Sequence, residues 1–177
     1  MRSPDNHAAT ATATTALLLA SATCLGYVET VLVPQSALPG ARLGLANIAI
    51  LLVLFTQGPA RAAFVSIARV ILVGLATGAL MTPVSGFAFA GAICSWGAMV
   101  AVARWGGERF SVVGWSIAGS AAHVCGQILA ATLLLGTTAP LLLFPISLAL
   151  ALLSGVATGL VARLLLSRLP SLSLSPA

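Results

Sequence analysis

Charged residues are the scarcest class in this sequence, and acidic residues are nearly absent. Of 177 residues only 6% are charged, and Asp and Glu together number three. The sequence has no Walker loop, no DDxxD-like acidic pair, no HExxH motif and no GxSxG motif. These absences argue against metal-dependent catalysis. We therefore expect no metal and no cofactor, and no motif supports an enzymatic role.

Cysteine is also scarce, and lysine is absent. The three cysteines are odd in number and none has CxxC spacing, so they indicate neither a disulfide framework nor a zinc site. The formal net charge of +5 comes from eight basic residues, all arginine, that are spread along the chain without a basic patch. This charge does not predict nucleic-acid binding.

Apolar residues dominate instead. They make up 59% of the chain, compared with about 45–50% in soluble domains. We predict an all-α integral membrane protein, a bundle of six transmembrane helices, because lipid cannot satisfy open backbone groups and the alternation of barrel strands is absent. Proline and glycine clusters divide the chain into its segments. The predicted helices span residues 13–33, 43–56, 60–81, 86–103, 112–135 and 141–166, within a transmembrane domain of residues 13–168 flanked by tails of residues 1–12 and 169–177.

The first segment also has the shape of a secretory leader, with Cys24 as a candidate lipid-acceptor residue. Its apolar run continues through LGYVETVLVP, which is longer than the apolar region of a leader. Thr23 is also a poor residue immediately before a cleaved cysteine. We therefore expect an uncleaved first helix.

The placement of the arginines predicts which way the bundle faces. With the N-terminus in the cytoplasm, only Arg42 lies in an external loop, and Arg69 falls within the third segment. This asymmetry follows the positive-inside rule, so we predict a multi-pass protein of the inner (cytoplasmic) membrane with both termini cytoplasmic. The cytoplasmic arginines are Arg2, Arg61, Arg104, Arg109, Arg163 and Arg168.

The second segment is short for a membrane crossing. Its roughly 14 residues cover about 21 Å of a hydrocarbon core near 30 Å thick. One interpretation is a re-entrant start below the outer surface, where free backbone N–H groups, Arg42 and Asn47 would face an anionic solute. The alternative is a helix that starts one turn earlier, with Arg42 extending to the lipid headgroups.

Polar residues inside the other segments predict a pocket. Arg69 is costly near the middle of a membrane, and its candidate partner is Glu29. If the two pair, they form a buried ion pair that fixes helix register; otherwise Arg69 faces a solute. In the fifth segment, spacings of four, three and four place Ser116, Ser120, His123 and Gln127 on one face, which indicates either interhelical contacts or a cavity wall.

Pairs of small residues four apart predict close helix packing. Such pairs occur in the first, third and sixth segments. They are Ala16 and Ala20, Gly74 and Gly78, and Gly155 and Gly159.

Several blocks resemble the Gx transporter family, also labelled heptaprenyl diphosphate synthase component I. They are Glu29 before Pro34, PGARLGLANI, GPARAAFVSIARVIL, SGFAFAGAICSWGAM and GSAAHVCGQILAA. The most specific parts are the PG(K/R)LGLANI block and the HNxGQ-like block. Arg42 replaces the more usual lysine, which keeps the charge. Val124 stands where the pattern has asparagine, so a role that needs this amide does not carry over.

The architecture is also similar to the substrate-binding S-components of energy-coupling-factor importers. That resemblance implies an alanine motif, here Ala16 and Ala20, that docks the protein to a transmembrane coupling subunit driven by two ATPases. It also implies an outward-facing pocket for a small polar or anionic solute. The candidate substrate-binding residues are Glu29, Arg42, Asn47, Arg69, Ser120, His123 and Gln127.

Three functions remain open, in this order. The first is uptake of a small solute by a binding subunit that a partner energises. The second is a membrane component that assists a polyprenyl diphosphate synthase in making quinone side chains, with a docking surface around RWGGER. The third is a proton-coupled carrier working alone, which needs a titrating pair such as Glu29 and His123.

Overall fold

The structure, a computed structural model, describes residues 4–32, 44–106 and 110–168. Within these ranges it contains helices and turns and no strand, so the predicted all-α class is confirmed. The helices are α1 (Pro4–Leu32), α2 (Leu45–Gln57), α3 (Pro59–Ala76), α4 (Pro83–Trp105), α5 (Val112–Leu135), α6 (Ala139–Leu142) and α7 (Phe144–Arg168).

The bundle is that of a multi-pass membrane protein. Five helices, α1, α3, α4, α5 and α7, are long and apolar enough to cross a membrane. Each of them exposes large apolar side chains, which is the arrangement expected of a surface that faces lipid rather than water. Examples are Leu17, Phe64, Ile93, Leu133 and Leu153. The sixth crossing stays a prediction, because α2 has only 13 residues.

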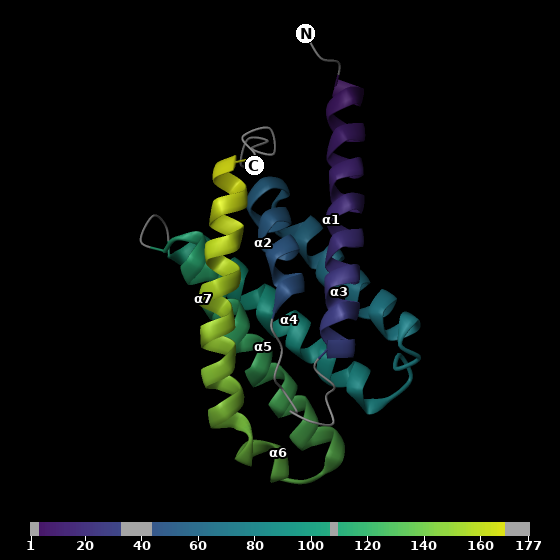
Figure 1. The fold of residues 1–177 in the computed structure, drawn as a ribbon, viewed down its shortest axis with the longest axis vertical. Coiled ribbons are helices and arrows are strands. Elements are labelled where there is room, and N and C mark those ends of the chain that lie inside the picture. The colour runs from purple at the N-terminus through teal and green to yellow at the C-terminus, as the bar shows by residue number, and fades with distance from the viewer. Residues whose placement is uncertain (1–3, 33–43, 107–109, 169–177) are drawn as a thin grey trace.

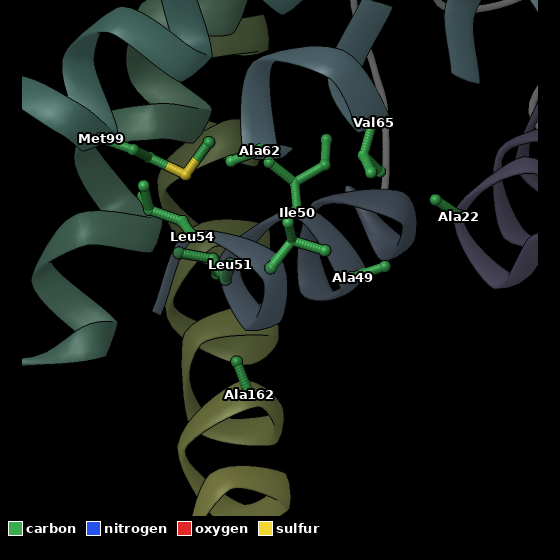
Figure 2. Packing of buried hydrophobic residues seen from close by; sticks show 10 residues of the cluster. Ala22, Ala49, Ile50, Leu51, Leu54, Ala62, Val65, Met99 and Ala162 are labelled. Carbon is green, nitrogen blue, oxygen red and sulfur yellow. The ribbon is translucent and has the colours of Figure 1, made fainter. Parts of the chain in front are cut away.

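Helix α2 lies at the centre of the bundle (Figure 1) and packs against α1, α3, α5 and α7. Its side chains are apolar on nearly every side, and a helix of that pattern is stable only when other helices surround it. The main core cluster is built around Ile50, Leu51 and Leu54 of α2. Figure 2 shows Ala22 of α1 and Met99 of α4 on opposite sides of these residues.

The helix boundaries differ from the prediction at four places. The fifth helix has the expected bounds, whereas α1 begins at Pro4, so residues 4–12 belong to this helix. α4 is longer at both ends than the predicted 86–103, because Pro83 opens it and it continues to Trp105. The last segment divides into the short α6 and the long α7.

The fourth difference concerns the end of α3. This helix ends at Ala76 because the chain turns at Gly78, whose φ of 70° is accessible to glycine without strain. Gly78 therefore lies outside the helix, and the predicted packing pair with Gly74 is wrong. Gly74 instead lets the turn fold back closely, since a Cβ on it would lie 3.3 Å from Leu80 Cα.

The start of α1 and the end of α7 lie at the same end of the bundle (Figure 1). Arg61 is in the first turn of α3, Arg104 is in the last turn of α4, and Arg163 and Arg168 are near the end of α7. All four are exposed. Because the chain reverses direction at each step from α1 through α2, α3, α4 and α5 to α7, these arginines gather at the end where α1 begins, which is the asymmetry that predicts orientation. That this end is cytoplasmic stays a prediction.

Candidate functional site

The candidate site is a polar pocket between five helices, which we call the central pocket. Its free volume is about 20 Å³, room for about one water. Its walls come from α1, α2, α3, α5 and α7, so residues far apart in the sequence meet there. The lining residues are Glu29, Gly44, Asn47, Arg69, Ser120, His123, Val124, Ala151 and Ser154.

The pocket exists because α2 starts inside the bundle. Gly44 precedes α2 with a φ of 70°, and a Cβ built on it would lie 3.7 Å from Ser154 Oγ and 3.8 Å from Thr158 Cγ2. Both of these residues belong to the middle of α7. The N-terminus of α2 therefore lies beside the middle of a spanning helix, and the pocket lies at this N-terminus.

Glu29 fixes this start of α2. Its Oε1 accepts a hydrogen bond of 2.7 Å from the backbone N–H of Gly44, and only 4% of Glu29 is exposed. A carboxylate at this place is also favoured by the positive end of the helix dipole. One backbone N–H group that was expected to bind a solute anion at the start of α2 therefore already donates to Glu29.

Arg69 and Glu29 line the same pocket although they lie on different helices. Arg69 is 5% exposed and belongs to the second half of α3. Gly26 brings α1 and α3 close together, since a Cβ on it would lie 3.3 Å from Val73 Cγ2 and 3.9 Å from Arg69 Cδ. Because Glu29 lies one turn beyond Gly26 on α1, this close approach places the carboxylate and the arginine on one cavity.

The residues of the polar face predicted on α5 differ in their surroundings. The Ser116 hydroxyl hydrogen-bonds Thr158 Oγ1 of α7 at 2.9 Å. Ser120 and His123, which are 4% and 6% exposed, line the central pocket. Gln127 is equally buried, and both it and His123 lie against α4, because a Cβ on Gly91 would be 2.7 Å from Gln127 Cγ and 2.9 Å from His123 Nε2.

The contact between α5 and α7 around Ser116 is closely packed, and we call it the α5–α7 seam (Ser116, Gly155, Thr158, Gly159). A Cβ on Gly155 would lie 3.0 Å from Ile117 Cα, and one on Gly159 would lie 2.7 Å from Val113 Cα. The pair of glycines predicted from the sequence thus lets the two backbones approach.

Five of the predicted binding residues therefore line one pocket. Gln127, one turn beyond His123 on the same face of α5, is not among the lining residues, and Arg42 lies outside the described residues. Sequence reasoning missed Ser154. Ser147, Ser154 and Thr158 are spaced seven and four apart on α7, which marks a polar face and was the available signal.

A second cavity, with a free volume of about 50 Å³, lies beside the first, between α1, α3 and the start of α4. Its walls are mostly apolar, and Arg69 lines both cavities. Within the described ranges, no three His, Cys, Asp or Glu side chains are grouped so that they could hold a metal ion.

Residues 18–165 match the family model described as heptaprenyl diphosphate synthase component I. The chain belongs to the heptaprenyl diphosphate synthase component I family. No curated protein and no solved structure matches it significantly. The range matched to this synthase-component family contains every residue that lines the central pocket, whereas Ala16 of the predicted docking pair precedes it.

Proposed function

We propose that this protein is the solute-binding membrane subunit of an uptake system that a partner energises. The observation that carries the proposal is the central pocket, in which charged and polar side chains are buried around empty space. Ionisable residues inside a membrane protein are costly and are typically kept for a substrate or ion pathway. The pocket lies toward the end of the bundle opposite the exposed arginines, so the solute enters from outside the cell.

The partner proposed for energy coupling is a transmembrane subunit with two ATPases, docked at Ala16 and Ala20. Both alanines are exposed on α1, and their small side chains leave a flat surface on which another helix can pack. On the buried face of the same helix, Thr15 Oγ1 hydrogen-bonds Gln57 of α2. The exposed face is therefore available to a partner without loss of this internal contact.

An accumulation assay tests the solute-binding role. Cells that express the chain with its coupling partners are supplied with a mixture of isotopically labelled small polar metabolites, and the cell contents are measured by mass spectrometry. At least one compound should accumulate with wild type but not with Ser120→Leu, which fills the pocket. Ser167→Leu, an exposed position on α7, is the matched control and should accumulate it normally.

The docking site is tested in the same assay. Ala16→Leu combined with Ala20→Leu should abolish accumulation while the purified protein keeps its melting temperature. Ala149→Leu combined with Ala157→Leu, at exposed positions on α7, should have no effect. A lower melting temperature in the α1 variant would show that the two alanines are needed for internal packing instead.

The second candidate function is a membrane component that assists a polyprenyl diphosphate synthase, and the family description is the observation that favours it. It predicts that a soluble prenyl diphosphate synthase co-purifies with the chain. It also predicts that Ser120→Leu changes neither this association nor quinone content. Association without any accumulated solute would favour this function over uptake.

A further inference from the structure

We propose that the central pocket takes a small solute of zero net charge that carries hydrogen-bond donors and acceptors side by side. This inference rests on the proposed solute-binding function and narrows it. It departs from the anionic solute that the short second helix and Arg42 suggested at the level of sequence.

Among the described residues that line the pocket, the charges balance when His123 is neutral. The lining contains one carboxylate, Glu29, one guanidinium, Arg69, and the imidazole of His123, and all three are at least nine-tenths buried. A buried anion placed beside Arg69 would also lie near Glu29, and a buried cation beside Glu29 would lie near Arg69. Like charges repel strongly where water is excluded, so either ion loses much of what it gains. A solute of zero net charge avoids this repulsion.

The hydrogen bond at the start of α2 also argues against an anionic solute. A helix N-terminus inside a membrane protein normally attracts the negative group of a solute. Here the N–H of Gly44 already donates to Glu29 Oε1 at 2.7 Å, so a carboxylate of the protein occupies the place that a solute anion would use.

The other polar groups of the pocket offer hydrogen bonds without charge. The Ser120 hydroxyl is buried, lines the pocket and has no hydrogen-bond partner within the described part of the chain. A buried hydroxyl is costly unless a ligand or a water satisfies it. The Asn47 side chain, 7% exposed, adds an amide that both donates and accepts. Paired donors and acceptors on the solute would match these groups.

The remaining walls limit the size of the solute. Val124 and Ala151 are small apolar side chains, and the free volume of the pocket is about 20 Å³, room for about one water, so a solute must be compact and must displace the walls to enter. A compact amino-acid-like zwitterion or a small amide therefore fits the chemistry of the pocket.

We call the preference for a solute of zero net charge the charge rule. A matched series of probes tests it on the purified full-length protein in nanodiscs. The probes are β-alanine, propionamide, propionate and propylammonium, which share a three-carbon frame and differ in charge. At equal millimolar concentrations, β-alanine and propionamide should raise the melting temperature of wild type by about 2 °C or more, and the two ions should not. In Glu29→Gln, which keeps an acceptor for Gly44 N–H but removes the negative charge, propionate should become stabilising.

Two pocket-filling variants show whether the probes raise the melting temperature by binding in the central pocket. Ser120→Leu should lose every probe response, and Val124→Phe serves the same purpose if the first variant does not fold. A wild-type response to propionate or propylammonium above that to β-alanine, lost in the filled variants, would overturn the charge rule while leaving a solute pocket. If no probe raises the melting temperature of wild type more than that of the filled variants, the charge rule is also overturned. The accumulation assay then decides separately whether the uptake function fails too.

Discussion

Two successive turns on one face of α5 use buried polar groups in opposite ways. In the α5–α7 seam, Ser116 and Thr158 hydrogen-bond each other, and Gly155 and Gly159 bring the backbones so close that no space is left. One turn along the same face, Ser120 and His123 lie on the wall of the central pocket. The difference shows that a polar face on a membrane helix lines a cavity only where the neighbouring helices leave room.

The space for the central pocket results from the position of α2 rather than from α5. Because α2 begins beside the middle of α7 and runs toward the end where α1 starts, no described helix fills the centre of the other half of the bundle. In the seam, by contrast, two long helices run side by side. The same polar residue types therefore stabilise helix association in one region and surround empty space in the other.

The seam should break most severely when a glycine is enlarged. Gly159→Leu places its Cβ 2.7 Å from Val113 Cα, where backbone atoms cannot give way. We expect a loss above about 3 kcal/mol, beyond the usual cost of overpacking, and little folded protein. Gly97→Leu on α4 is the control, because nothing lies within 4 Å of a Cβ there. Size-exclusion profiles and melting curves measure both, and equal behaviour of the two variants would contradict the close contact.

The pocket should be most sensitive at the bond that holds the start of α2. Glu29→Ala removes the acceptor of the Gly44 N–H, and a hydrogen bond to a charged group contributes about 1.5–3 kcal/mol. We expect the melting temperature to fall accordingly. Glu29→Gln keeps an acceptor oxygen and should lose much less. If both variants melt together well below wild type, the charge of Glu29 matters more than its hydrogen bond.

Arg69 tests whether the pocket is a site or a structural ion pair. As a binding residue, Arg69→Gln should purify normally and bind β-alanine at least about tenfold more weakly, equivalent to roughly 1.4 kcal/mol. Titrations by melting temperature measure this. A structural pair instead predicts a stability loss that Arg69→Gln combined with Glu29→Gln largely restores, and that double-variant result would contradict the binding role.

Much of the fold was predictable because helix ends in this chain are marked by proline and glycine. The bounds of α5 and the shortness of α2 follow from such signals and from apolar run length. The end of α3 was missed because the apolar run continues into a turn, and apolar composition alone does not separate a helix from a turn that packs on it. The positive φ of Gly78 is a backbone property that its sequence position does not reveal.

Five residues that line the candidate site were predictable from the sequence, but their arrangement was not. Ionisable side chains are costly inside a membrane, and this cost identified Glu29, Arg69 and His123 as candidates. Spacing placed His123 and Gln127 on one face, but the neighbours of a face depend on tertiary packing. Gly91 of α4 lies against both His123 and Gln127, yet only His123 also lines the pocket, and Ser154 enters the pocket because α2 begins beside it.

The smallest effects give the most direct comparison of the two regions, because the same substitution is made twice, four residues apart. Ser116→Ala removes the seam hydrogen bond to Thr158, whose own hydroxyl still donates to Ser154 O at 2.8 Å. Interhelical hydrogen bonds of this kind contribute on average about 0.6 kcal/mol, so the melting temperature should fall slightly. Ser120→Ala removes a buried hydroxyl that has no partner in the described chain, so stability should stay level or rise while β-alanine binding weakens. Ser167→Ala, at an exposed position, is the control for both. If Ser120→Ala destabilises the protein as much as Ser116→Ala does, Ser120 is an interhelical contact like its neighbour, and the distinction between seam and pocket fails.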